Sequence, residues 1–276
     1  NAEVVAICDT NENSRNQTKS LVKDSTKFYN DLNELISKNI ADAYIIATPN
    51  FTHINILEQI LKTNKHLLIE KPLCTTTEDC KKFELMSQNY SKIIWTGMEY
   101  RYMPPVQQLI KEVHNSIIGK IKMLSIREHR FPFLHKVNDW NRFAVNTGGT
   151  LVEKCCHFFD LMRLVIQSEP TKIYASGNQD VNHLEEKYDG KTPDIIDNVF
   201  VMSSRETYSS YFSFSLLQSF SLTHINTKLI YHQLSLNNYV PLKFSDVHFL
   251  PLHMTTRDRI RKYGRKFNII HRMNEN

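Results

Sequence analysis

The chain has 276 residues, of which 41% are hydrophobic and 23% are charged, and its formal net charge is +5. This composition is typical of a globular protein and excludes a collagen-like, coiled-coil or largely disordered chain. Seven basic residues against one acid between Arg257 and Arg272 account for the positive charge. The rest of the chain is nearly neutral and lacks the basic face expected of a nucleic-acid-binding protein.

Several signatures are absent from the sequence. It contains only seven glycines, and no GxGxxG or GxxxxGK[ST] phosphate-binding loop can be written in it. Its five cysteines have no CxxC spacing, which argues against a disulfide framework or a zinc site. No apolar run approaches the ~20 residues that span a bilayer, and no signal peptide begins the chain. We therefore expect a cytoplasmic protein with no metal, membrane or nucleic-acid partner.

The first part of the chain alternates short apolar strands with helices. Strands are predicted at 3–8, 42–47, 66–69 and 92–96, and helices at 11–23, 54–62 and 76–88. This alternation predicts a parallel sheet built from βαβ units. Polar clusters follow three of the strands, namely Asp9, Thr48-Pro49-Asn50 and Glu70-Lys71-Pro72. Because ligands bind beyond the carboxyl ends of parallel strands, these clusters predict one binding edge.

The pattern changes after Gly97. Helices are predicted at 104–113 and 151–166, and strands at 120–130, 171–176, 198–203 and 208–215. Strands gathered around one apolar helix predict a second, α+β domain, so we divide the chain into domains 1–118 and 119–276. No elements are assigned after Leu216. The basic tail has apolar residues at helical spacing, typical either of a solvated terminal helix or of an amphipathic helix that binds a membrane surface or a partner.

Two of the polar clusters suggest ligand binding. An acid such as Asp9 after a strand can accept hydrogen bonds from ribose hydroxyls and would repel a 2′-phosphate, which favours NAD over NADP. The alternative is a helix cap. Lys71 would donate to a substrate oxygen or orient a nicotinamide ring, with Glu70 keeping it charged and Pro72, in a cis bond, fixing the backbone. The alternative is an exposed lysine in a turn.

A third cluster follows Gly148-Gly149. On one continuous helix, Glu153, His157 and Asp160 would lie at i, i+4 and i+7, forming a polar stripe on an otherwise apolar surface. Histidine can transfer a proton near neutral pH, and a carboxylate can orient it. The alternatives are a satisfied internal network and, less favoured because HExxH is absent, a metal site. A loop at Trp140-Asn141-Arg142 is typical of a wall that binds a polar ligand.

The order of these motifs resembles the Gfo/Idh/MocA oxidoreductases, the family of glucose–fructose oxidoreductase and inositol 2-dehydrogenase. The resemblance runs from the strand before Asp9 through Ala47-Thr48-Pro49-Asn50 and Glu70-Lys71-Pro72 to the segment 148–160. It implies a Rossmann domain followed by an α+β domain with a mostly antiparallel sheet. It also implies NAD as cofactor, a small sugar or polyol substrate and a homo-oligomer.

The resemblance assigns roles to individual residues. It implies a catalytic group of Lys71, Glu153 and His157. It implies substrate contacts at Arg101, Trp140, Asn141 and Asp160. It implies cofactor contacts at Asp9, Thr48, Pro49, Asn50, His53, Glu70 and Lys71.

The expected activity is hydride transfer between a nicotinamide cofactor and a sugar or polyol hydroxyl. Three departures from the family pattern bear on it. Glu153 replaces the usual aspartate, and residues 216–276 do not follow the family's usual sheet-and-helix ending. We also expect an N-terminally truncated chain, because the family's first strand and glycine loop, about 25–30 residues, are not found in the sequence. Alternatives are a non-catalytic NAD- or sugar-binding regulatory protein, an inactive fragment, and an enzyme that cleaves glycosides through transient oxidation.

Overall fold

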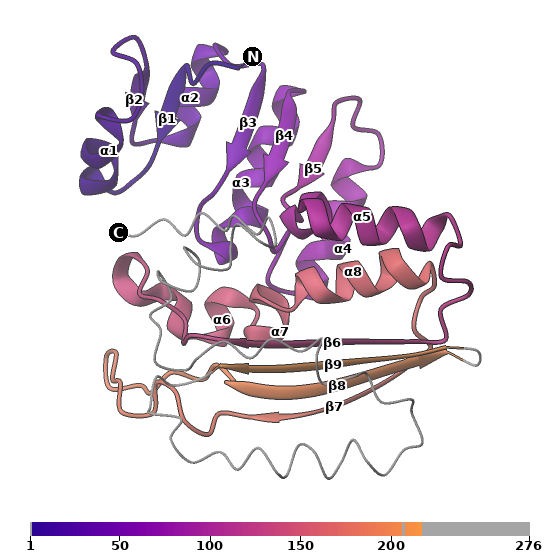
Figure 1. The fold of residues 1–276 in the computed structure, drawn as a ribbon. Helices are drawn as coiled ribbons and strands as arrows, with labels where there is room; N and C mark the ends of the chain where they lie inside the picture. Colours follow the sequence, from indigo (N-terminus) through magenta and orange to yellow (C-terminus); the bar gives the residue numbers. More distant parts are fainter. Residues whose placement is uncertain (1, 206–207, 217–276) are drawn as a thin grey trace, which may run out of the picture. The chain divides into compact units, whose positions relative to one another are not determined.

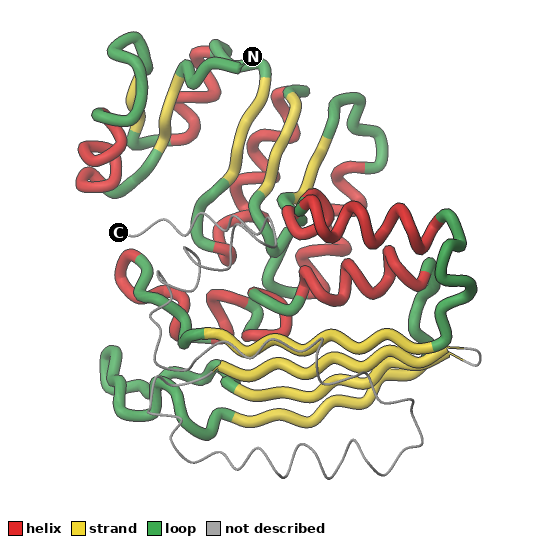
Figure 2. Tube along the Cα trace, viewed as in Figure 1, coloured by secondary structure: helices red, strands yellow, loops and turns green. Residues whose placement is uncertain are grey.

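The computed structural model describes residues 2–205 and 208–216. Its first part alternates strands with helices, as Figure 2 shows in yellow and red, and so confirms the predicted α/β pattern. The elements are β1 (Ala6–Cys8), α1 (Glu12–Lys19), β2 (Lys27–Tyr29), α2 (Leu32–Lys38), β3 (Ala43–Ile46), η1 (Asn50–Thr52), α3 (His53–Ile60), η2 (Leu61–Thr63), β4 (His66–Ile69), α4 (Thr77–Ser87) and β5 (Ile94–Thr96).

All pairings in this first part are parallel. The strand β1 pairs with β2, and β3, β4 and β5 form a separate sheet in that order. Within the described ranges, neither sheet hydrogen-bonds to the other. Parallel strands place their carboxyl ends at the same edge, so the segments after β3, β4 and β5 meet there.

One face of the three-stranded sheet is buried. Tyr44 and Ile46 of β3 and Leu67 and Ile69 of β4 point to this face and pack against helices that include α3, whose Leu57 is fully buried. The opposite face carries Ile45, Leu68 and Trp95, which are paired across the three strands and exposed.

Two elements between residues 24 and 41 were not predicted. The strand β2 has three residues, and the helix α2 has seven. A start signal for α2 is present, because the side chain of Asp31 accepts a hydrogen bond from the Glu34 N–H at 2.8 Å. The helix ends at Asn39, which has a left-handed backbone with φ of 48°.

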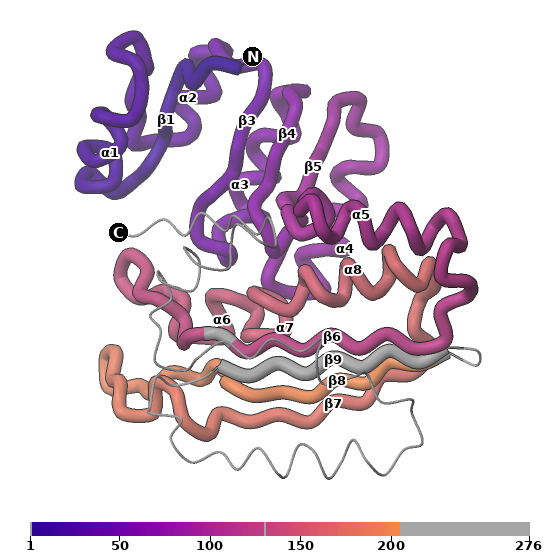
Figure 3. Tube along the Cα trace, in the orientation of Figure 1, coloured from indigo at the N-terminus to yellow at the C-terminus, as the bar shows by residue number. Residues whose placement is uncertain are grey.

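The second part contains one four-stranded sheet. Its elements are η3 (Glu99–Tyr102), α5 (Pro104–His114), β6 (Met123–Arg130), η4 (Val137–Arg142), α6 (Ala144–Thr147), α7 (Thr150–Glu153), α8 (Cys156–Ile166), β7 (Lys172–Asn178), β8 (Asn198–Arg205) and β9 (Tyr208–Leu216). The order is β6-β9-β8-β7, in which only β6 and β9 are parallel, so the predicted mostly antiparallel sheet is confirmed. Figures 1 and 3 show α6, α7 and α8 on one face of it. The predicted basic helix lies outside the described residues.

The predicted continuous helix over 151–166 is wrong. The N–H groups of Lys154 and Cys155 both donate to the carbonyl of Thr150, at 3.0 and 3.2 Å, which ends α7. Cys155 then caps α8, which begins at Cys156. Glu153 therefore lies on a different helix from His157 and Asp160, and the three do not form a single stripe.

The glycine pair before α7 is required by geometry. Gly148 has φ of 82°, and a Cβ there would lie 2.7 Å from a Val152 methyl and 2.8 Å from the Thr75 carbonyl oxygen. A side chain at this position would force α7 away from the loop that follows Lys71.

Asp197, just before β8, holds the loop that leaves β7. Its buried carboxylate accepts hydrogen bonds from three consecutive N–H groups, of Asp180, Val181 and Asn182, at 3.0, 2.7 and 2.6 Å. Burial by itself would raise the pKa of Asp197, but these hydrogen bonds outweigh burial and hold the pKa below its usual range.

We expect Asp197→Asn to lower the free energy of unfolding by about 2 kcal/mol at neutral pH. The folded-state pKa is depressed, so the stabilisation is complete above the unfolded pKa of about 3.9 and is lost as the pH falls through the folded value. Urea unfolding of both proteins from neutral to acidic pH measures this. A difference that does not shrink in acid would contradict the assignment.

Candidate functional site

Lys71 follows β4 and precedes Pro72 through a cis peptide bond, as predicted. Its ammonium donates to the carbonyl oxygen of Glu153 at 2.9 Å and lies 3.7 Å from the Glu153 Oε1 atom. Both side chains are largely buried, with 21% and 15% exposed. The expectation that Glu70 keeps Lys71 charged is wrong, because Glu70 accepts a hydrogen bond from the Lys71 backbone N–H instead, and Glu153 is the counter-charge.

Asn50 holds the other oxygen of Glu153. It follows β3 in η1, its side chain is buried, and its amide donates to the Glu153 Oε2 atom. Thr48 and Pro49 precede it, and both contact the Thr52 hydroxyl, through Thr48 Oγ1 and the Pro49 carbonyl, each at 2.7 Å. Residues that follow two neighbouring strands thus converge on one carboxylate of α7.

His53 contacts the backbone of both loops, the one after β3 and the one after β4. It is fully buried, with Nδ1 lying 3.0 Å from the Pro72 carbonyl oxygen and Nε2 lying 3.0 Å from the Thr48 carbonyl oxygen. The side chain therefore fixes the backbone just after Lys71 relative to the loop that follows β3. Its predicted direct contact with the cofactor stays a prediction.

We expect His53→Ala to lower the free energy of unfolding by about 2–4 kcal/mol, because it opens a cavity and removes a hydrogen bond to a buried backbone carbonyl group. Thermal or urea unfolding measures the loss. The conservative control is Thr52→Ser, which retains the hydroxyl that contacts Thr48. Equal stability of His53→Ala and the unmodified protein would contradict this role.

His157, in the first turn of α8, is 1% exposed and is held by residues that follow β5. Its ring stacks on the Tyr100 ring, with centroids 4.2 Å apart and an interplanar angle of 8°. Its Nε2 atom lies 3.4 Å from the Glu99 Oε1 atom. The neighbouring Arg101 forms a two-pronged ion pair with Asp160, one turn further along α8. Three consecutive residues of η3 therefore contact α8.

The thiol of Cys156 lies beside this group. Burial raises its pKa to about 11, although the nearby Lys71 ammonium opposes the rise. A thiol with this pKa stays protonated at neutral pH, so Cys156 is unsuited to act as a nucleophile.

The residues of the predicted loop wall, Trp140-Asn141-Arg142, make contacts with other parts of the protein. Arg142 is 1% exposed, and its guanidinium binds the Glu186 carboxylate at 2.8 Å and the Phe133 carbonyl at 3.0 Å. Buried Asn141 donates to the Leu134 carbonyl at 2.9 Å, and the Trp140 ring meets Phe51 edge-on, with centroids 6.3 Å apart. None of these contacts joins the loop to Lys71 or His157, and the predicted substrate contacts stay predictions.

Asp9 follows β1, in the two-stranded sheet. Its carboxylate accepts a hydrogen bond from the Asn11 N–H at 2.8 Å, next to the start of α1. Arg15 of α1 donates to the Asp9 carbonyl oxygen at 2.5 Å. The carboxylate thus has a local partner of the helix-capping kind, and it keeps further acceptor sites for a ligand hydroxyl.

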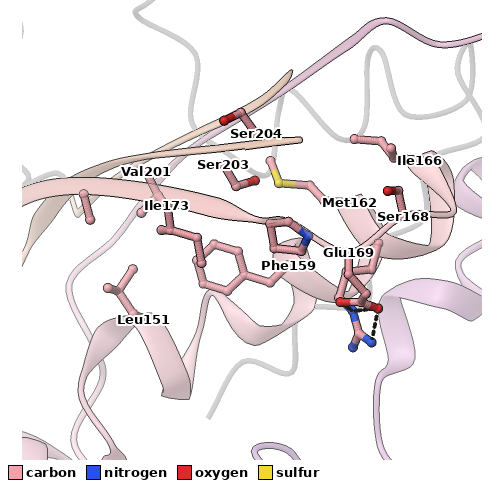
Figure 4. A pocket seen from close by; sticks show the side chains of 13 residues that line it. Leu151, Phe159, Met162, Ile166, Ser168, Glu169, Ile173, Val201, Ser203 and Ser204 are labelled. Atoms are coloured by element: carbon pink, nitrogen blue, oxygen red, sulfur yellow. Dashed lines mark hydrogen bonds and ion pairs between the residues drawn. The ribbon is translucent and has the colours of Figure 1, made fainter. Parts of the chain in front are cut away.

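A separate cavity of about 330 Å³ lies between α8 and the strands β7 and β8 (Figure 4). Figure 4 shows Phe159, Met162 and Ile166 lining it from α8, with Ile173 and Val201 from the sheet. At 100° per residue, these helix positions face away from His157. This apolar cavity therefore shares no residue with the Lys71–Glu153–His157 group.

The polar group at the strand ends is suited to proton and charge handling. It presents the largely buried Lys71 ammonium, Glu153 carboxylate and His157 imidazole, with the exposed Glu99 carboxylate beside the imidazole. The sequence did not single out Glu99, Tyr100 or Lys154. The only signals for them were their positions beside Arg101 and Glu153 in the recognised motifs.

Comparisons with known proteins match both parts of the chain. Residues 1–98 match the oxidoreductase family with an NAD-binding Rossmann fold, and residues 110–204 match the C-terminal alpha/beta domain of the same family. The myo-inositol 2-dehydrogenase of Thermotoga maritima is 28% identical over 179 residues, which cover 64% of this chain and 51% of that protein.

Solved structures agree in fold. A probable dehydrogenase from Thermotoga maritima has a TM-score of 0.64 at 25% identity, covering 76% of this chain and 60% of the other. The WlbA dehydrogenase from Bordetella pertussis, in complex with NADH and UDP-GlcNAcA, has a TM-score of 0.65 at 18% identity, covering 79% and 65%.

The chain spans about half the length of the curated relatives it matches. Across the described residues, no helix has the length and apolar character required to cross a membrane. Both matched segments, the parallel and mostly antiparallel sheets and the ordered motifs agree on one assignment. The chain belongs to the Gfo/Idh/MocA family of oxidoreductases.

Proposed function

We propose that the protein oxidises a hydroxyl group of a sugar or polyol with NAD as hydride acceptor. The observation that carries this proposal is that Lys71, from the end of β4, contacts Glu153, the last residue of α7, which ends just before the helix α8 that carries His157. In the proposed reaction these side chains serve as hydrogen-bond donor, orienting carboxylate and proton acceptor, respectively Lys71, Glu153 and His157. Relatives that are named as inositol 2-dehydrogenases support an activity of this kind.

The chain's residues fit NAD at two of its parts. The Asp9 carboxylate, at the carboxyl end of a parallel strand, suits the adenosine ribose hydroxyls and would repel a 2′-phosphate, which favours NAD over NADP. The loops after β3 and β4 lie where the nicotinamide part would bind. When bound, NAD supplies a hydride acceptor at C4 of the nicotinamide ring.

The protein's residues act on the substrate hydroxyl and its proton. Lys71 donates a hydrogen bond to the substrate oxygen and stabilises the negative charge that develops as the C–H bond breaks. His157 accepts the hydroxyl proton, and Glu99 lies where it can pass that proton towards solvent, because 57% of its side chain is exposed. Glu153, held by Asn50, positions Lys71.

The reaction balances as a two-electron oxidation. The carbinol C–H bond breaks and its electron pair leaves with the hydrogen as hydride, while the O–H proton goes to His157 and a carbonyl group forms. The products are a ketone or lactone, NADH and one proton. Burial of Lys71, Glu153 and His157 excludes water from these side chains and strengthens the electrostatic contacts of the Lys71 ammonium.

A panel of polyols and hexoses tests this function. The full chain is mixed with NAD and each compound, NADH formation is followed by absorbance, and NAD binding is measured separately by calorimetry. We expect NADH with at least one compound. Binding of NAD without any turnover would favour a non-catalytic regulatory protein, and release of an aglycone from a glycoside without net NADH would favour cleavage through transient oxidation.

A further inference from the structure

Lys154 is a charged residue that the proposed reaction does not use. It lies in the turn between α7 and α8, and only 9% of its side chain is exposed. A buried ammonium is costly unless it is paired and hydrogen-bonded. Lys154 has both an ion-pair partner and a hydrogen-bond partner. The hydrogen-bond partner, Tyr100, also contacts His157 of the candidate active site.

The ammonium of Lys154 contacts Tyr100. It donates to the Tyr100 hydroxyl at 2.5 Å and lies 4.8 Å from the centroid of the Tyr100 ring. The Glu128 carboxylate of β6 lies 3.7 Å from the ammonium and supplies its counter-charge. A hydrogen bond, an ion pair and a cation–π contact together fix where the Tyr100 ring lies.

Tyr100 also contacts His157, because the two rings are stacked. The two rings are nearly parallel, so the position of the Tyr100 ring sets the plane of the imidazole. The chain of contacts runs from Glu128 through Lys154 and Tyr100 to His157. Because its members come from β6, the α7–α8 turn, η3 and α8, it couples the four-stranded sheet to the candidate site.

We propose that Lys154 and Tyr100 are positioning residues for His157, which hold its ring plane and place a positive charge one ring away from it. The catalytic meaning of this inference rests on the proposed function, whereas the coupling itself does not. A cation near an imidazole disfavours the protonated ring, so we expect removal of the Lys154 charge to make His157 easier to protonate.

Other charged groups also face His157 and act at the same time. Glu99 of η3 lies 3.4 Å from the Nε2 atom and favours the protonated ring, while Lys71 and Glu153 act with opposite signs on the thiol of the adjoining Cys156. Asp160, paired with Arg101, lies one turn further along α8, and Glu128 of β6 faces the Lys154 ammonium. Replacing Lys154 also removes the counter-charge of Glu128, so the measured shift reports the Lys154–Glu128 pair as a unit.

The experiment is an NMR titration of the His157 imidazole in the full chain, which requires no turnover. Two variants remove the charge: Lys154→Met, and Lys154→Gln, which keeps a donor for Tyr100 and Glu128 and protects the fold. We expect both to raise the titration midpoint by about one unit. The control Lys172→Met removes an exposed lysine from β7 and should leave the midpoint unchanged.

Kinetics add a second measurement for the same variants. If a substrate is found, the acid limb of the kcat/KM profile should move up with the midpoint, and kcat at neutral pH should fall, by at most about tenfold for a shift of one unit, with little change in KM. A His157 midpoint that is the same in all four proteins would overturn the inference, even if turnover is normal. A shifted midpoint without turnover on any compound supports the coupling and counts against the proposed function alone.

Discussion

Replacing Lys71 with methionine should lower kcat/KM for the proposed oxidation by a factor of about 10²–10³, which is the usual effect of removing one donor to a developing oxyanion. Methionine keeps much of the volume and the unbranched shape of lysine, so the fold should be retained. The loss should appear mainly in kcat, because the contact strengthens as charge develops in the transition state. Steady-state kinetics on the substrate found in the panel measures it.

The matched control is Lys62→Met, which removes an exposed lysine from η2 in the same part of the chain. It should leave kcat and KM unchanged. Activity of Lys71→Met equal to that of the control would remove Lys71 from the mechanism. A loss of activity could come from weaker NAD binding or from a slower chemical step. Calorimetric titration with NAD separates these two causes, because a purely catalytic role of Lys71 leaves NAD affinity unchanged.

Replacing His157 with phenylalanine should lower kcat by a factor of about 10²–10⁴, the range expected for a general base. Phenylalanine retains a planar ring that can stack on Tyr100, so the substitution removes the proton acceptor and preserves the packing. A second variant, His157→Ala, opens a space beside Tyr100. Added imidazole should partly restore its activity, because it can occupy that space and accept the proton.

Full activity of His157→Phe would exclude His157 as the base. Failure of imidazole to rescue His157→Ala, together with a normal fold by circular dichroism and normal NAD affinity, would also count against this role. Glu99→Gln is a useful companion, since it tests the passage of the proton towards solvent. We expect it to slow the reaction less than either His157 variant.

The regular elements were predicted where local signals are strong. The strand His66–Ile69 and the helix α4, with Thr76 as its cap, agree with the predicted limits to within one residue. Apolar alternation and a capping threonine are sufficient for such elements. The strand β2 was missed because three residues, only partly buried, carry almost no periodic signal.

The residues of the candidate site could be predicted from the sequence, but the contacts between them could not. Lys71 and Glu153 are 82 positions apart, and only the fold brings them together. The pairing of Glu153 with Asn50 depends on the end of α7, which a sequence period of 3.6 residues cannot reveal. In the same way, the surroundings of His157 come from η3 and β6, which pack against α8 from distant parts of the sequence.

The most direct test of the central claim is the fate of the carbinol hydrogen. The full chain is incubated with NAD and polyols or hexoses that carry deuterium on carbon, and the reduced cofactor is analysed by mass spectrometry. Deuterium should be transferred to the cofactor, and Lys71→Met and His157→Phe should largely abolish the transfer. Reduced cofactor without deuterium, or equal transfer by both variants, would contradict it.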